Sequence, residues 1–260
     1  MAVWEAIVLG VVQGAAEFLP ISSSGHLAVL EHLWRVPESA RLPLTVALHL
    51  GTAVAVVVFF ARRIGGIVAG LFSGEPGRCR AAWRMAGMIA AASVPAAVVG
   101  LGFGDAIDRA FASPIFVGIC LLVTGAVLFG TRFLTPGCAG LGWRRAVLVG
   151  LAQAAAVLPG VSRSGATITA GLYSGLGGEA AFEFSFLLSV PAVLGAAALE
   201  LPELASTGLD PAAAGLGAAV ALASGLAALW LLRRAVAGGR LHFFAYYCWL
   251  AGLAVLLFVR

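Results

Sequence analysis

Long apolar runs separated by short polar segments dominate the pattern of this chain. Runs that are almost free of charge cover residues 43–61, 85–104, 110–131, 184–199, 211–232 and 241–259. A helix needs about 20 apolar residues to cross the hydrocarbon core of a bilayer. The pattern therefore predicts an all-α integral membrane protein with six membrane-spanning helices.

Two further apolar stretches are too short to cross a bilayer, and each leads into a polar tip. The first covers residues 6–16 and stops at Glu17, before the tip Pro-Ile-Ser-Ser-Ser-Gly. The second begins at Ala146 and ends at the tip 159–165. Because non-helical backbone at membrane depth must be surrounded by protein or by a water-filled cavity, we predict two re-entrant helix hairpins, at 3–34 and 144–177.

The two hairpins repeat each other at a spacing of 140 residues. The recurring residues are Gly10, Gln13, Ala15, Ala16, Ser22, Ser24 and Gly25, which return as Gly150, Gln153, Ala155, Ala156, Ser162, Ser164 and Gly165. A hairpin returns to its own side of the membrane, whereas three spans end on the opposite side. The second half is therefore expected to be inverted relative to the first, with sites near the midplane where the tips meet.

This reasoning divides the chain into two predicted repeats. The first repeat, 1–135, contains the hairpin 3–34 and spans at about 43–61, 85–104 and 110–131. The second repeat, 136–260, contains the hairpin 144–177 and spans at about 182–201, 211–232 and 241–259.

Composition excludes a soluble enzyme, since 61% of the residues are hydrophobic and only 11% are charged. The net charge of +4 indicates no nucleic-acid partner, because the arginines lie between the spans. Arginine favours cytoplasmic segments. With the N-terminus outside, eleven arginines are cytoplasmic (Arg62, Arg63, Arg78, Arg80, Arg84, Arg132, Arg144, Arg145, Arg233, Arg234 and Arg240) and four are outside (Arg35, Arg41, Arg109 and Arg260). The first hairpin then enters from the outer side and the second from the cytoplasm.

Glu17 and Gln13 are the first candidates for chemistry. An ionised carboxylate in an apolar half-helix is costly and usually functional, and Gln13 lies one helical turn before it. Mg²⁺ or Ca²⁺ suits oxygen ligands of this kind and commonly bridges carboxylates to substrate phosphates. The pair is therefore a candidate metal site, with Glu17 also a candidate base. A purely structural role, tying the hairpin to the bundle, stays open.

The first tip adds hydroxyl groups and an imidazole. His26 follows Ser23 by three positions, so it is predicted to relay a proton to or from a hydroxyl, a water or a leaving phosphate. Ser22, Ser24 and Gly25 complete the tip as candidate substrate-binding residues. His49, within a span, is an open candidate for the same cavity. The aromatic residues are expected mostly at span ends, and none is assigned to the site.

Arg163 is the strongest single candidate in the second tip. An arginine inside the membrane needs an anionic partner, and its planar fork matches phosphate oxygens. An ion pair with Glu17 is an alternative that is compatible with phosphate binding. Gly160, Ser162, Ser164, Gly165 and Thr167 would supply hydroxyls and backbone N–H groups at the start of a half-helix. Helix capping is the alternative for each serine alone.

These two stretches resemble the motifs of the undecaprenyl-diphosphatase family of bacitracin-resistance membrane proteins. The family's first motif, Glu/Gln-x-x-x-Glu followed by Phe-Leu-Pro-hydrophobic-Ser-Ser-Ser/Thr-Gly-His, is matched from Gln13 to His26. The second, Pro-Gly-x-Ser-Arg-Ser-Gly-Ala-Thr, is matched from Pro159 to Thr167. Glutamine at position 13 departs from many members, which carry glutamate there. It leaves Glu17 as the essential carboxylate.

The resemblance implies hydrolysis of undecaprenyl diphosphate to the monophosphate and inorganic phosphate, which recycles the carrier lipid for peptidoglycan and confers bacitracin resistance. It implies a catalytic Ser23 and His26, a metal-dependent acidic motif at Gln13 and Glu17, and Arg163 as the diphosphate clamp. The expected partners are this lipid substrate and membrane lipids. The expected location is the bacterial inner membrane, with the site open to the outer face. The choice between serine attack and water attack stays open, and so does a homodimer. The alternative function, a transporter or flippase of an anionic polyprenyl phosphate lipid, also stays open.

Overall fold

The computed structural model describes residues 3–23, 25–27, 30, 34, 38–135, 137–205 and 211–258, without the side chains of 38–42, 108 and 196–205. Its described secondary structure is helical, apart from one isolated β-bridge between Ala139 and Leu176. The helices are α1 (Val3–Phe18), α3 (Glu38–Phe59), α4 (Ala61–Leu71), α5 (Pro76–Gly102), α6 (Gly104–Phe111), α7 (Pro114–Gly130), the 3₁₀ helix η1 (Thr131–Phe133), α8 (Trp143–Ala155), α9 (Arg163–Tyr173), α10 (Gly178–Ala205), α11 (Pro211–Ala237) and α12 (Phe243–Phe258).

Four helices of the described chain are long and apolar enough to cross a membrane, namely α5, α7 with η1, the part of α10 up to Gly195, and α11. A fifth crossing forms if α3 and α4, which meet at a bend of 68°, count as one span. The sixth predicted span corresponds to α12, an apolar helix of 16 residues, which is shorter than a full crossing. The chain is therefore a multi-pass membrane protein.

The third predicted span, at about 110–131, corresponds to the candidate span Pro114–Phe133. Residues 104–111 form the separate helix α6, and α7 begins at Pro114. Ser113 caps α7 by accepting a hydrogen bond from the Phe116 N–H at 3.3 Å, and proline suits the first helical position because it has no N–H to leave unpaired. These residues fix the boundary that apolarity alone did not reveal.

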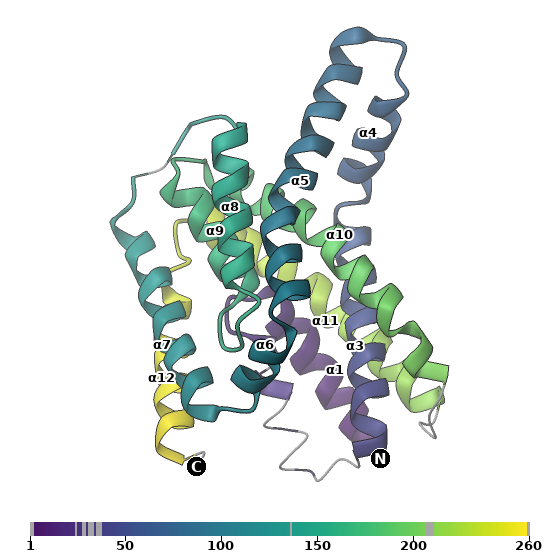
Figure 1. Ribbon diagram of the computed structural model, residues 1–260, viewed down its shortest axis with the longest axis vertical. Helices are drawn as coiled ribbons and strands as arrows, with labels where there is room; N and C mark the ends of the chain where they lie inside the picture. The colour runs from purple at the N-terminus through teal and green to yellow at the C-terminus, as the bar shows by residue number, and fades with distance from the viewer. Residues whose placement is uncertain are drawn as a thin grey trace.

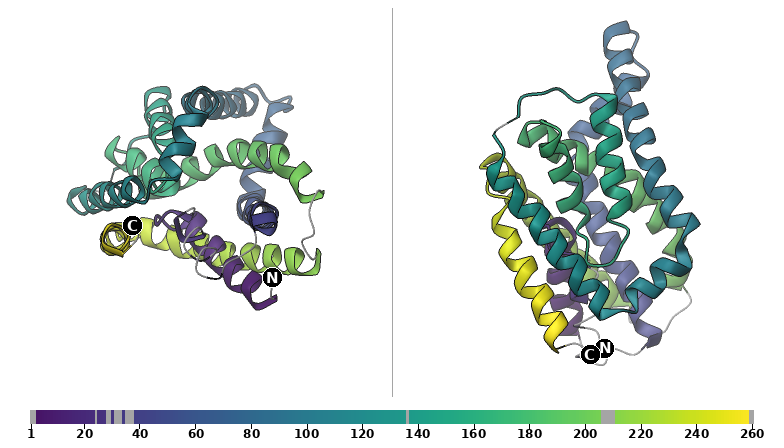
Figure 2. Two further views of the ribbon diagram at one scale, coloured as in Figure 1. Left: turned by 60° about the horizontal axis from the view of Figure 1, so that its bottom comes forward. Right: turned by 60° about the vertical axis from the view of Figure 1, so that its left-hand side comes forward.

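Figure 1 shows the chain directions that place the two predicted tips. Both termini lie at the bottom, where α1 begins, whereas α4 and the first turns of α5 protrude from the top. α8 descends from the top and α9 returns to it, and Figure 2 shows the two helices side by side from another direction. α1 and α8 thus start at opposite ends of the bundle. The arginine-bearing segments α4, η1, the start of α8 and the end of α11 share the top.

Close helix crossings hold α1 and α8 against long helices. α1 packs on α11, and α8 packs on α5. A Cβ built on Gly10 would lie 2.6 Å from the Gly217 carbonyl oxygen of α11, and one built on Gly150 would lie 2.7 Å from the Ala92 Cα of α5. Both crossings therefore need glycine, which allows two helix backbones to approach closely in a membrane.

An aromatic cluster buried in the bundle fixes the end of α1. Phe18 and Phe186 pack edge to face with their ring centroids 5.8 Å apart, and Phe182 and Phe186 are 4.9 Å apart. Phe60, which lies between α3 and α4, stacks on Phe186. Aromatic pairs of this geometry stabilise a core beyond their buried area. Because Phe18 follows Glu17 directly, the cluster also sets where the Glu17 side chain lies.

Candidate active site

The ends of α1 and α9 meet in the interior of the described bundle. α1 ends at Phe18 because Pro20 follows and cannot continue a helix. α9 begins at Arg163. A Cβ built on Gly165, in the first turn of α9, would lie 3.1 Å from the Cβ of Pro20. The two tips that the sequence places 140 residues apart are thus in contact.

Glu17 is the centre of the hydrogen-bond network between the tips. Its Oε1 pairs with Nη2 of Arg163. Its Oε2 accepts a hydrogen bond from the Ser23 hydroxyl at 2.7 Å and from Nε2 of Gln13 at 3.3 Å. The side chains of Glu17 and Arg163 are only 16% and 21% exposed. The ion pair between Glu17 and Arg163, which the sequence left open as an alternative, is present in the structure, and the carboxylate gathers three of the predicted site residues.

The backbone of the first tip is bent sharply after Pro20. The Ile21 N–H donates to the Leu19 carbonyl at 2.7 Å, and Ser22 has a φ of +67°. A non-glycine residue in this left-handed region is uncommon and costs about 1–3 kcal/mol unless its surroundings impose it. The bend buries Ser22 and points the Ser23 hydroxyl at Glu17. Strain of this kind is common where a backbone positions functional groups.

The second tip is organised mainly by its own hydroxyl groups. Ser162 is the N-cap of α9, and its Oγ accepts a hydrogen bond from the Gly165 N–H at 3.2 Å. The Ser162 and Ser164 hydroxyls are 3.2 Å apart. Thr167 donates to the Arg163 carbonyl at 2.7 Å and lies 2.5 Å from the Ser185 hydroxyl of α10. The capping alternative is thus what the structure shows for Ser162.

Gly160 connects the second tip to α7. Its φ is +87°, and its carbonyl accepts a hydrogen bond from the Thr124 hydroxyl at 3.2 Å. A Cβ at this position would lie 2.5 Å from the Val117 carbonyl oxygen. Glycine is therefore required here both by backbone conformation and by space. In the first tip, Gly25 lies near the side chain of the same Val117, at 4.0 Å from a built Cβ.

His26 lies apart from the Glu17 network. Its Nδ1 is 2.7 Å from the Ser22 carbonyl oxygen, and its Nε2 pairs with the Tyr247 hydroxyl of α12. The imidazole stacks on the Tyr247 ring with centroids 5.6 Å apart and an interplanar angle of 18°. Within the described residues, His26 makes no hydrogen bond to Ser23 or Arg163. The proton relay predicted for His26 stays a prediction.

Two buried glutamines have polar atoms without a partner in the described structure. They are Gln13, through Oε1, and its repeat counterpart Gln153, through both side-chain atoms. Gln13 is fully buried and Gln153 is 4% exposed. A buried amide atom without a hydrogen bond costs about 1–3 kcal/mol. The unpartnered Gln13 Oε1 is the kind of ligand that an oxygen-preferring divalent cation takes, although the amide turns its Nε2 and not its Oε1 to the Glu17 carboxylate. No cluster of three or more histidine, cysteine or acidic residues occurs in the described chain.

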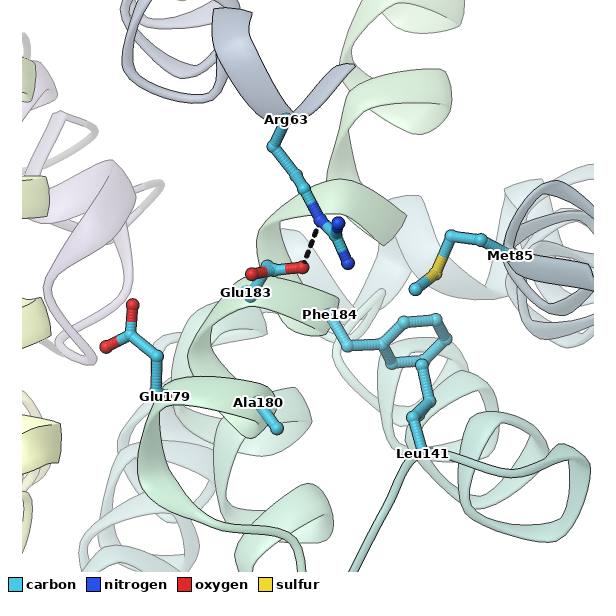
Figure 3. Close-up of a pocket in the computed structure, with 7 residues that line it drawn as sticks. All are labelled: Arg63, Met85, Leu141, Glu179, Ala180, Glu183 and Phe184. Atoms are coloured by element: carbon cyan, nitrogen blue, oxygen red, sulfur yellow. Dashed lines mark hydrogen bonds and ion pairs between the residues drawn. The ribbon is translucent and has the colours of Figure 1, made fainter. Parts of the chain in front are cut away.

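A separate cavity of about 350 Å³ lies between α4, α5 and α10, away from the two tips (Figure 3). Its charged lining residues are Arg63, Glu179 and Glu183. Arg63 and Glu183 form an ion pair at 2.5 Å, and Glu179 pairs with Arg233 of α11 at 2.6 Å. Each of these charged side chains is therefore paired in an ion pair that joins two helices, and the pairs account for the charges in the lining. None of the predicted site residues lines this cavity.

The sequence-based site is brought together only in part. Glu17, Gln13, Ser23 and Arg163 form one network, and Ser164 and Thr167 are buried in the same helix α9 as Arg163. Ser24 lies outside the described residues. His49 of α3 is close enough to Glu17 for an electrostatic interaction. Tyr247 was missed, because nothing local marks it and 221 residues separate it from His26. Ser185 was not named as a site residue, although the stretch 183–191 around it also resembles the family.

The fold and this centre define a class of protein, a multi-pass helical membrane protein with a carboxylate, a guanidinium and hydroxyl groups gathered between two helix ends. The chain belongs to the bacitracin resistance protein BacA family, whose sequence profile matches residues 6–254.

Curated relatives cover almost the whole chain. The undecaprenyl-diphosphatase of Alkaliphilus metalliredigens is 39% identical over 272 residues, which cover 99% of each chain. That of Desulfosudis oleivorans is 43% identical over 264 residues, with 95% of each chain covered. That of Thermomicrobium roseum is 42% identical over 281 residues, covering 100% of this chain and 99% of the relative.

Proposed function

We propose that this chain hydrolyses undecaprenyl diphosphate to undecaprenyl monophosphate and inorganic phosphate. The observation that carries the proposal is the ion pair between Glu17 of α1 and Arg163 of α9, with Ser23 bonded to the same carboxylate. The name undecaprenyl-diphosphatase of three relatives at 39–43% identity supports it. Recycling of the carrier lipid for peptidoglycan and other envelope glycans, and resistance to bacitracin, follow from this activity.

Arg163 is suited to hold the diphosphate. Its Nη2 bonds Glu17, and a guanidinium carries five N–H donors in a planar fork, which leaves donors for phosphate oxygens. An anionic headgroup entering between the tips would share Arg163 with Glu17. Phosphoryl transfer depends mainly on such positioning and on charge neutralisation.

Ser23 is oriented for attack on phosphorus. Its O–H donates to Glu17 Oε2 at 2.7 Å, so the lone pairs of its oxygen point away from the carboxylate. Glu17 therefore holds the serine in a fixed direction and is the group placed to take its proton. Both the serine route and a route in which Ser23 orients an attacking water use this arrangement.

A divalent cation, Mg²⁺ or Ca²⁺, would be held by Gln13 Oε1 and Glu17, with further ligands from the diphosphate and water. Bound there, the cation would neutralise negative charge on the diphosphate. Gln13 can supply an amide oxygen but no proton acceptor, so Glu17 remains the base of the motif.

The architecture we propose is an inverted repeat of two halves, 1–135 and 136–260, each with a re-entrant hairpin. The opposite directions of α1 and α8 support it (Figure 1). So do the matching glycines, since Gly10 and Gly150 each lie at a close crossing with a long helix of the other half. The hairpins would bring the tips together at membrane depth, where protein surrounds the non-helical backbone.

The proposed location is the bacterial inner membrane, with the first tip reached from the outer face. The clustering of the arginine-bearing segments at one end of the bundle supports this orientation. The polyprenyl tail would stay in the lipid phase among the membrane lipids. A homodimer is not needed to complete this site, because all of its proposed residues come from one chain.

A second candidate, transport of an anionic polyprenyl phosphate lipid, is favoured by the same opposite chain directions. Transporters use broken helices from two inverted halves at one central site. The two candidates differ in chemistry, because transport requires neither a hydroxyl bonded to a carboxylate nor the release of phosphate.

The deciding experiment measures phosphate release from undecaprenyl diphosphate by the purified protein in detergent, before and after chelation of divalent cations. Glu17→Gln, which removes the negative charge, and Arg163→Lys, which keeps the positive charge but removes the planar fork of donors, should each lower the rate by at least ~100-fold. Glu179→Gln, at an exposed ion pair far from the tips, serves as the control and should retain full activity.

The outcomes separate the candidates. Metal-dependent release that both tip variants abolish supports the phosphatase. A well-folded wild type that releases no phosphate refutes it, and movement of the lipid across vesicle membranes would then support transport. Hydrolysis that persists in Ser23→Ala would exclude serine attack, and a phosphoenzyme trapped by rapid quench would identify the serine route directly.

A further inference from the structure

The C-terminal helix α12 holds the first tip through two adjacent residues. Cys248 is completely buried and donates a hydrogen bond from Sγ to the Pro20 carbonyl at 3.2 Å. Its neighbour Tyr247 pairs with Nε2 of His26. α12 thus contacts the tip at its beginning and near its end, although more than 220 residues separate the two segments.

These contacts determine the proton arrangement of His26. A carbonyl oxygen can only accept, so His26 Nδ1 must carry the hydrogen that is donated to Ser22. In a neutral imidazole the other nitrogen, Nε2, is then an acceptor, and the Tyr247 O–H donates to it. The ring stack between His26 and Tyr247 holds the imidazole plane as well. One tautomer and one orientation are therefore selected.

The same contacts leave His26 without a nitrogen that faces the reacting groups directly. Nδ1 is engaged by a backbone carbonyl, and Nε2 by a phenol. The Ser23 proton is directed to Glu17 and not to His26. Among the described residues, the Tyr247 hydroxyl is the one side-chain group that bonds Nε2.

We propose that the Tyr247 hydroxyl both orients His26 and passes to Nε2 the proton of the water that completes hydrolysis. This inference rests on the proposed phosphatase function. Either route of hydrolysis consumes one water. The water loses a proton to the Tyr247 oxygen as the phenolic proton of Tyr247 moves to Nε2 of His26. Tyrosine is thereby regenerated and His26 becomes an imidazolium. The hydroxide formed from the water attacks phosphorus. Ser22 continues to accept the Nδ1 hydrogen throughout.

Tyr247→Phe is the test, because phenylalanine keeps the ring stack and removes only the hydroxyl. Tyr246→Phe is a matched control: Tyr246 is the preceding residue of α12, with an exposed fraction of 42% against 43% for Tyr247. With undecaprenyl diphosphate as substrate, Tyr247→Phe should lower kcat by ~100-fold, within the usual range for a lost proton-transfer group. KM should change by less than about threefold, and Tyr246→Phe should match wild type.

A double variant tests whether Tyr247 acts through His26. In a His26→Ala background, Tyr247→Phe should cost nothing further, because residues that act as one unit are not additive. Equal losses in both backgrounds would overturn the inference, as would an unchanged kcat or a loss confined to KM. Size-exclusion chromatography of each variant checks that the fold is retained.

A spectroscopic readout is independent of activity. In protein labelled with ¹⁵N-histidine, the His26 signals, assigned by their loss in His26→Ala, should report a hydrogen on Nδ1 and an unprotonated, hydrogen-bonded Nε2. Tyr247→Phe should shift the Nε2 signal, and Tyr246→Phe should not. An unchanged Nε2 signal overturns the inference even if the protein is an active phosphatase. An inactive wild type with the expected signals refutes the proposed function and leaves the contact to Tyr247 standing.

Discussion

The ion pair between Glu17 and Arg163 makes a quantitative prediction about stability as well as function. Glu17→Gln replaces a carboxylate that accepts hydrogen bonds from three side chains with an amide that has only one acceptor oxygen. The new amide N–H₂ must then face either Arg163 or the donors Ser23 and Gln13. Arg163→Gln removes the cation instead and leaves the carboxylate unpaired.

The exposure of the pair sets the expected size of the effect. Two unit charges 4 Å apart attract by about 4 kcal/mol at an effective dielectric constant of 20, and desolvation offsets part of this. Removing one partner of a fully buried pair costs about 3–5 kcal/mol. Since these side chains keep 16% and 21% exposure, we expect about 2–3 kcal/mol for each single variant. The coupling free energy between them should be about 2 kcal/mol.

A double-mutant cycle measures this coupling. Unfolding by SDS in mixed micelles, followed by fluorescence of the six tryptophans, would be compared for wild type, Glu17→Gln, Arg163→Gln and the double variant. The pair Arg233 and Glu179, with both side chains 53% exposed, is the matched control and should couple by only about 0–1 kcal/mol. Additivity at Glu17 and Arg163 within ~0.5 kcal/mol would refute the reasoning, because it would mean that the two charges do not interact.

Two further predictions concern packing and orientation. Gly150→Ala should lower the unfolding free energy by about 1–3 kcal/mol, because its Cβ would lie 2.7 Å from the Ala92 Cα and force α5 and α8 apart. Gly100→Ala, on α5 with open space around it, should be neutral or slightly stabilising in the same assay. The exposed Cys138, in the connection between η1 and α8, should react with a membrane-impermeant thiol reagent in inverted vesicles and not in intact cells. Labelling only in intact cells would reverse the proposed orientation. The variant Cys138→Ser controls for labelling of other thiols.

Hydropathy predicted the positions of the long helices well, because a membrane span must be apolar along its whole length. It predicted their ends less well. Apolarity continues from residue 110 into α7, and only Ser113 and Pro114, as cap and first residue, reveal where the helix starts. The 68° bend between α3 and α4 likewise has no marker in the apolar pattern.

The members of the network around Glu17 could be named from the sequence, although most of their contacts could not. An intramembrane carboxylate and an intramembrane arginine each require a partner of opposite charge, and the 140-residue repeat indicated that their tips are equivalent. That argument kept the Glu17–Arg163 ion pair among the alternatives, and the structure contains it. The role of Ser162 as a helix cap was also among the alternatives, because a serine that precedes a helix can accept hydrogen bonds from its free backbone N–H groups.

The sequence by itself thus determined that the chain is a membrane protein, where most of its spans lie, and which charged residues must find each other. Only the tertiary structure decided that Ser23 donates to Glu17, and that His26 pairs with Tyr247 of α12. Those choices depend on the bend at Ser22 and on the packing of α12 against the first tip. Burial requires that polar groups find partners, whereas the identity of each partner depends on distances between segments far apart in the chain.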